Sequence, residues 1–290
     1  MTTQKHGREL KPLLGAGLAF VAMSFFSIQD AMVKWLATDY ILFQLLFVRS
    51  VVAVPLLLFI LRFRYGQRAL HTSRPQDHAI RATINFAAFL SYYFAITRMP
   101  LADVTAIALS APLFMTALSG PLLGEPADLP RKLALLAGFI GVLVIVQPTA
   151  DNIDWLGVAA ALIGAMLFAL LGIQTRRMAS SESSELMVFY SASAFLVITG
   201  IIMLGTWKMP IATDFVLMFV LGLVSVTAQF CIVHSFRYAQ VYVIAPFEYV
   251  TILWAIFLGW LLFSDLPTSI MLAGAAIVVG CGLYIVFRKQ

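Results

Sequence analysis

Three charged side chains interrupt long apolar runs of this sequence, namely Asp30, Arg49 and Glu248. Arg49 lies eight residues into a run that starts near Ile41 and contains LLFVRSVVAVPLLLF. At such depth in hydrocarbon a charge costs about 2.5–3.5 kcal/mol on insertion scales, so it needs a partner or a water-filled cavity. A guanidinium fork suits a carboxylate or phosphate. Arg49 therefore forms a buried ion pair with Glu248 or Asp30, binds an anionic group of a small molecule, or does each in turn.

Uncharged polar side chains also occur inside apolar runs. Asn85 and Tyr92 are seven residues apart in RATINFAAFLSYYFAI, which places them on one helical face, and Gln229 lies in a later run. Polar and aromatic groups along one stripe suit a cavity that binds an amphipathic solute. Interhelical hydrogen bonding explains Asn85 and Gln229 nearly as well. The candidate binding residues are Arg49, Asn85, Tyr92, Gln229 and Glu248.

Other polar side chains favour structural roles. Asp30 and Lys34 are four residues apart, so we expect a local ion pair with Lys34 directed to the membrane surface. Aromatic residues near predicted helix ends predict an interfacial belt. The belt residues are Trp35, Trp155, Trp207 and Tyr40.

The sequence predicts neither a metal site nor another cofactor. His71 and His78 lie in the longest predicted loop, and no pair of histidines has metal-ligand spacing. Cys231 and Cys281 lie inside predicted helices, which argues against a disulfide framework. No G-x-x-x-x-G-K-[ST] stretch occurs, so an ATP-driven motor is not indicated.

Composition indicates the elements that position these residues. The chain has 290 residues, of which 61% are hydrophobic and 11% charged, against about 25% charged in soluble domains. A membrane-spanning helix needs about 20 apolar residues, and helices satisfy their backbone groups within lipid. We therefore predict an all-α membrane protein with ten transmembrane helices. These lie near residues 13–36, 41–61, 79–97, 101–123, 132–147, 155–174, 185–206, 214–236, 240–263 and 269–287.

Basic residues predict the orientation. If the N-terminus is cytoplasmic, fifteen of the 19 Lys and Arg fall in cytoplasmic segments, and Lys34, Arg98 and Lys208 fall on the opposite side. This bias places both the N and C termini in the cytoplasm. The net charge of +5 is then explained by membrane topology, and we expect no nucleic-acid partner.

Weak internal similarity predicts two halves, residues 1–149 and 150–290. Lys34 corresponds to Arg176, and Glu125 corresponds to Asp265, at spacings of 142 and 140 residues. A repeat of five helices is odd, so the second half enters the membrane from the opposite side. Such inverted repeats support alternating access to a site between the halves.

Prolines and glycines indicate where the helices bend and pack. Pro112 and Pro121 interrupt the fourth predicted helix, and Pro246 interrupts the ninth. Interruptions in corresponding helices point to a binding region, although ordinary proline kinks also occur in membranes. Glycines such as Gly141 and Gly274 allow close packing of the fifth and tenth helices.

Several short motifs together resemble one transporter family. They are VRS early in the second predicted helix, S-A-P-L-F in the fourth, the G-E-P that closes it, and LLAGFIGVLV in the fifth. Along the whole chain they resemble the ten-helix EamA branch of the drug/metabolite transporter superfamily. The resemblance implies a transporter of a small-molecule substrate in the bacterial inner membrane, not an enzyme, and we expect it to function as a monomer.

The resemblance leaves substrate and direction open. The branch that exports aromatic amino acids favours an exporter of amino acids or similar small amphipathic metabolites, working by alternating access. FSIQDAMVKWL followed by VRS also resembles importers of S-adenosylmethionine or riboflavin, so import of such a cofactor-like metabolite is the alternative. The first helix lacks the glutamate that four-helix multidrug exporters use for proton exchange. Coupling through Glu248 or Asp30, and facilitated diffusion, both stay open.

Overall fold

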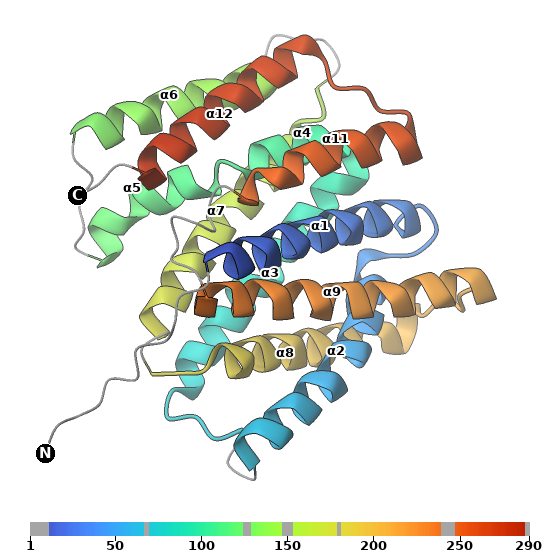
Figure 1. The fold of residues 1–290 in the computed structure, drawn as a ribbon. Coiled ribbons are helices and arrows are strands. Elements are labelled where there is room, and N and C mark those ends of the chain that lie inside the picture. The colour runs from blue at the N-terminus through green and yellow to red at the C-terminus, as the bar shows by residue number, and fades with distance from the viewer. Residues whose placement is uncertain are drawn as a thin grey trace, which may run out of the picture.

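A computed structural model describes residues 12–66, 70–123, 129–146, 153–178, 181–238 and 247–287 as a bundle of helices (Figure 1). No strand occurs in these ranges. The helices are α1 (Pro12–Leu36), α2 (Leu42–Tyr65), α3 (Pro75–Arg98), α4 (Leu101–Ala108), α5 (Ala111–Leu123), α6 (Leu129–Val146), α7 (Trp155–Met178), α8 (Ser184–Thr206), α9 (Ala212–Tyr238), α11 (Val250–Phe263) and α12 (Ser269–Phe287).

Every predicted apolar run contains a helix. Within the described part, seven helical spans are long and apolar enough to cross a membrane, and three apolar helices are shorter. One of the seven, Leu101–Leu118, comprises α4 and part of α5. The shorter ones are Lys132–Val146, Phe247–Phe263 and Ser269–Tyr284. The prediction of an all-α multi-pass membrane protein is confirmed. Glu125, Pro246, both termini and the boundary at 149–150 lie outside the described residues.

The fourth predicted helix is broken in two. α4 ends at Ala108, Leu109 and Ser110 form a turn, and α5 begins at Ala111. Pro112 has no N–H to donate to the preceding turn, and the Ser110 hydroxyl instead donates to Ile107 O at 2.6 Å. The ninth predicted helix, near residues 240–263, has a comparable turn at Tyr249, just before α11. Tyr249 lies 140 residues after Leu109.

Helices from the two predicted halves pack in reciprocal pairs. α1 packs on α9 as α3 packs on α7, and α2 contacts α9 as α3 contacts α8. α2 also packs on α8, α4 on α11 and α6 on α12. Figure 1 shows α1 beside α9, and α6 beside α12 in a layer at the edge of the bundle. Two similar halves would produce this pattern, and the inverted repeat itself stays a prediction.

Glycines set the closest helix contact of that outer layer. A Cβ added at Gly274 of α12 would lie 2.8 Å from Gly141 O and 2.9 Å from Ile145 N on α6. These atoms belong to backbone, which cannot rotate away. The prediction that these glycines allow close helix packing is confirmed for Gly141 and Gly274.

Two predictions about surface residues are wrong. Tyr40 is only 5% exposed, because its hydroxyl donates to Asp214 Oδ2 at 2.7 Å. The tryptophans predicted to share its belt are exposed. His78 lies in the first turn of α3 rather than in a loop, and it is 2% exposed. Pro75 starts the helix early, since proline is well suited to a first helical position.

Candidate functional site

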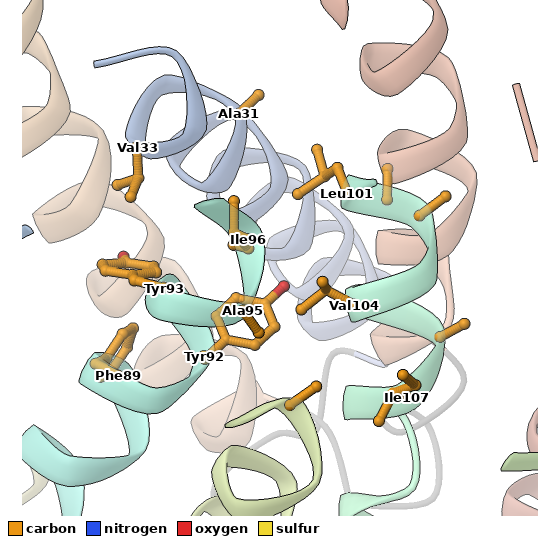
Figure 2. Close-up of a cluster of buried hydrophobic side chains, with 14 of the residues drawn as sticks. Ala31, Val33, Phe89, Tyr92, Tyr93, Ala95, Ile96, Leu101, Val104 and Ile107 are labelled. Carbon is orange, nitrogen blue, oxygen red and sulfur yellow. The ribbon is translucent and has the colours of Figure 1, made fainter. Parts of the chain in front are cut away.

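A group of polar side chains, here called the central cluster, connects α1, α2, α3, α4 and α9 inside the bundle. It comprises Gln29 and Asp30 of α1, Arg49 of α2, Tyr92 and Tyr93 of α3, Thr105 of α4 and Ser225 of α9. Figure 2 shows how the two tyrosines diverge from α3: the Tyr93 ring lies beside Phe89, whereas the Tyr92 hydroxyl points toward α4. The central cluster thus draws on both predicted halves.

Arg49 is held by a phenol and two aromatic rings. Its side chain is 8% exposed, and Nη1 donates to Tyr93 Oη at 3.0 Å. The guanidinium carbon lies 4.6 Å from the ring centroid of Phe89 and 5.9 Å from that of Phe195. Cation–π contacts of this kind stabilise a desolvated arginine. The Phe195 ring comes from α8, so the second predicted half supplies part of this environment.

No carboxylate pairs with Arg49 among the described residues. Ion pairs with Glu248 and with Asp30 were the structural alternatives, and neither is present. The charge of Arg49 still acts on Asp30 at longer range. The bond to Tyr93 is the hydrogen bond that the Arg49 side chain makes in the described part of the chain, so its other N–H groups have no acceptor there.

Tyr93 is the centre of a hydrogen-bonded chain across four helices. Its hydroxyl oxygen accepts from Gln29 Nε2 at 2.6 Å as well as from Arg49. Gln29 Oε1 in turn accepts a hydrogen bond from the Ser225 hydroxyl. Because both tyrosine bonds use the oxygen as acceptor, the Tyr93 hydroxyl hydrogen is left available as a donor.

Asp30 lies on the other side of the tyrosine pair. Its Oδ2 accepts from the Tyr92 hydroxyl at 3.1 Å, and Thr105 Oγ1 lies 3.4 Å from the same hydroxyl. The predicted local pair of Asp30 with Lys34 is wrong. Lys34 Nζ instead lies 2.9 Å from Asp265 Oδ2. Asp30 has no cationic partner among the described residues.

Aromatic rings border the tyrosines and Arg49. The Phe168 ring of α7 lies 5.4 Å from Phe89 and 6.0 Å from Tyr92, in edge-to-face arrangements. Phe195 lies 6.0 Å from Phe89 in the same kind of contact. These edge-to-face contacts pack the rings against one another in the core of the bundle.

The candidate residues are only partly brought together. Arg49 and Tyr92 belong to the central cluster, whereas Asn85, Gln229 and Glu248 make no hydrogen bond or ion pair to it. Asn85 Oδ1 is buried without a hydrogen-bond partner in the described part. Gln229 is partly buried one turn after Ser225, and Glu248 is partly buried shortly before α11.

Sequence reasoning missed Gln29, Tyr93 and Ser225. Gln29 adjoins Asp30 in FSIQDAM, so a polar pair inside an apolar run was a usable signal. Tyr93 was considered only as a flank of the Tyr92 face, since neighbouring residues on a helix point about 100° apart. Nothing in the local sequence of Ser225 distinguishes it from a serine that bonds its own helix.

Comparison with known proteins adds a family resemblance. Residues 13–147 match the EamA-like transporter family. The similarity to proteins named as transporters extends along most of the chain.

Three relatives illustrate what similar chains carry. The S-adenosylmethionine uptake transporter of Rickettsia conorii is 27% identical over 96% of this chain and 94% of that protein. The pseudopaline exporter CntI of Pseudomonas aeruginosa is 26% identical over 91% of this chain and 93% of that protein. A riboflavin transporter of Vibrio cholerae is 26% identical over 92% of this chain and 91% of that protein.

A solved structure shares the fold of this chain. It is a crystal structure that matches with a TM-score of 0.64 at 16% sequence identity. The match covers 95% of this chain and 95% of that chain. At this identity the likeness concerns the fold alone.

Proposed function

We propose that this chain is an EamA-like transporter that carries a small zwitterionic metabolite with an aromatic group across a bacterial inner membrane. S-adenosylmethionine is the first candidate, and the direction is inward. The observation that carries the proposal is the pair of opposite charges, Arg49 and Asp30, that have no ionic partner among the described residues. Tyr92 and Tyr93 hold the two charges apart.

Arg49 would bind the carboxylate of the cargo. Its Nη1 is bound to Tyr93, which fixes the side chain, while its other donors have no acceptor in the described part. A guanidinium with free parallel donors binds a carboxylate in bidentate geometry. The Tyr93 hydroxyl hydrogen can add a further bond to the same anion.

Asp30 would bind a cationic group of the cargo. Its carboxylate already accepts from Tyr92, which orients it, and no lysine or arginine of the described ranges neutralises it. S-adenosylmethionine has an ammonium and a sulfonium group besides its carboxylate, so it can satisfy both charges. Burial of opposite charges is far less costly when they are paired.

The aromatic residues would bind the ring of the cargo. The ring centroid of Phe89 lies 4.6 Å from the guanidinium carbon of Arg49. The ring centroids of Phe168 and Phe195 lie 5.4 Å and 6.0 Å from that of Phe89. Adenine and the flavin ring both stack on such faces. This requirement is shared by S-adenosylmethionine and riboflavin, which relatives of this chain carry according to their names.

Alternating access is supported by the packing of the two halves. The reciprocal helix pairs place elements of both halves around the central cluster. The turns at Leu109 and Tyr249 interrupt corresponding helices, and interrupted helices commonly form transporter sites. All proposed binding groups belong to one chain, so we expect a monomer to suffice.

Export of amino acids or similar metabolites is the second candidate. The similarity to a pseudopaline exporter favours it, because that relative moves its substrate outward. Arg49 and Asp30 would bind an amino-acid head group in the same way. The two candidates differ in direction and in the size of the cargo.

Counterflow in proteoliposomes tests the proposal. Vesicles with purified protein are loaded with unlabelled S-adenosylmethionine, riboflavin or phenylalanine, and accumulation of the labelled compound is followed. We expect S-adenosylmethionine to accumulate with wild type and with Arg62→Ala, an exposed residue of the same helix, but not with Arg49→Ala. No accumulation above protein-free vesicles for any zwitterion would refute the proposal.

Direction needs intact cells. Cells that express the transporter should take labelled S-adenosylmethionine from the medium faster than control cells. Faster release of label from preloaded cells, without faster uptake, would instead establish export.

A further inference from the structure

A second buried polar cluster lies where α3 and α8 begin, far along α3 from the tyrosine pair. His78 is 2% exposed, and its ring packs at a tilt against that of Tyr190 of α8, with centroids 4.4 Å apart. Its Nε2 lies 3.6 Å from Glu182 Oε2, and neither ring nitrogen has a hydrogen-bond partner in the described part. A buried imidazole without a hydrogen bond costs free energy, and a bond from the ring to Glu182 would remove that cost.

Glu182 is held in place from the other side. Its Oε1 accepts from the Thr72 hydroxyl at 2.7 Å, and its side chain is 5% exposed. Glu182 lies just before Ser183, whose side chain accepts from Leu186 N at the start of α8. The contact between His78 and Glu182 therefore joins an element of the first predicted half to one of the second.

The polar groups around this contact come from four elements. Near His78 on α3 and at its cap are Asp77, Arg81 and Arg74; on α8 are Glu185 and Tyr190; on α2 is Arg64; and α7 contributes the uncharged Gln174. Arg64 lies 2.8 Å from Glu185 and is 42% exposed. Arg74 and Asp77, which lie 3.9 Å apart, are also exposed to solvent at 45% and 39%.

Glu182 has no cationic partner in the described part when His78 is neutral. Arg81 is 9% exposed and donates to Met187 O and the Ser191 hydroxyl rather than to a carboxylate. Glu185 is paired with Arg64, whereas the Glu182 side chain is 5% exposed and faces His78. A proton on His78 would therefore supply the positive charge that pairs with Glu182.

We propose that His78 and Glu182 form a proton-binding site that fastens α3 to α8. Histidine is the side chain whose charge normally changes between about pH 5 and 8. A neutral imidazole offers one N–H, while the protonated ring offers two and carries a charge that Glu182 can pair. Binding of a proton therefore strengthens the contact between the halves at this end, and loss of the proton loosens it.

The other end of the bundle has a corresponding contact that does not respond in this range. Tyr40 precedes α2 as Glu182 precedes α8, and Asp214 lies in the first turn of α9 as His78 lies in that of α3. The hydrogen bond to Asp214 raises the pKa of Tyr40 above its usual range. Tyr40 therefore keeps its proton at physiological pH, so this contact does not change its protonation between pH 6.0 and pH 8.5.

Hydrogen exchange of the backbone tests the site without any transport substrate. The protection factor of peptides over residues 183–190, corrected for the intrinsic exchange rate, is measured in detergent at pH 6.0 and pH 8.5. For wild type we expect about tenfold more protection at pH 6.0 than at pH 8.5, because a charge-assisted bond between the protonated ring and Glu182 stabilises the closed contact. His78→Gln and Glu182→Gln should show no such difference.

His71→Gln is the matched control, because His71 is an exposed histidine of the preceding segment and should keep the wild-type response. An equal pH response in His78→Gln, or none in wild type, would overturn the inference. Either result would leave the proposed cargo unaffected.

Discussion

Arg49 shows how a single residue can be accommodated in lipid without a counter-ion. Inserting the charge costs about 2.5–3.5 kcal/mol. A cation–π contact contributes about 2 kcal/mol when desolvated, and a hydrogen bond from a charged donor about 1.5–3 kcal/mol. Phe89 and Tyr93 supply these two contacts, so the cost is approximately offset. The remaining donors are then free to bind cargo.

Tyr93 should be more important for stability than its position beside Tyr92 suggests. Tyr93→Phe removes the acceptor of both Gln29 and Arg49, leaving two buried donors unsatisfied. We expect a loss of about 1–3 kcal/mol in unfolding free energy, measured by denaturation in mixed micelles. Tyr65→Phe, at an exposed site, is the control. Equal stability of the two variants would contradict this role.

Asp154 should make stability depend on pH in the acid range. The hydrogen bond from Arg98, at 2.7 Å, is the main cause that lowers the pKa of Asp154, and a bond from Gly157 N at 2.9 Å adds to it. A lowered pKa contributes stability above the unfolded value of about 3.9, which is lost as pH falls through the folded value. The melting temperature of Asp154→Asn should be below wild type at pH 6 and converge with it below pH 4. A constant difference would argue against the effect.

At the scale of elements, the apolar runs predicted the helices well because their length and composition alone distinguish them. The contacts of helix ends were less predictable. Lys34 has a nearby acid in sequence, yet it pairs with Asp265, which follows the C-cap of α11, Ser264, whose φ is positive at 58°. Such partners depend on which helices are neighbours, and sequence spacing does not contain that information.

The contact between α6 and α12 should be sensitive to one methyl group. Gly274→Ala places a Cβ within 2.9 Å of backbone atoms of α6, so the helices must separate. We expect the free energy of unfolding to fall by about 1–3 kcal/mol, as for other overpacked positions. Gly205→Ala is the control, because a Cβ at that position meets no atom within 4 Å. If both variants unfold alike, the helices do not touch as described.

At the scale of the whole molecule, the sequence predicted the similarity to EamA-like transporters and two residues of the central cluster. Arg49 and Tyr92 were recognisable as polar groups in apolar runs, and both belong to the central cluster. Gln29, Tyr93 and Ser225 were not, because their roles arise only when α1, α3 and α9 pack together. The inverted repeat stays a prediction that the reciprocal packing supports.

Discrimination between S-adenosylmethionine and decarboxylated S-adenosylmethionine tests the central claim most directly. The two compounds differ by the carboxylate that Arg49 is proposed to bind. Initial uptake rates into proteoliposomes are compared for wild type and Arg49→Gln. We predict that wild type favours S-adenosylmethionine by at least about tenfold and that the preference disappears in Arg49→Gln. An undiminished preference in the variant would contradict the account.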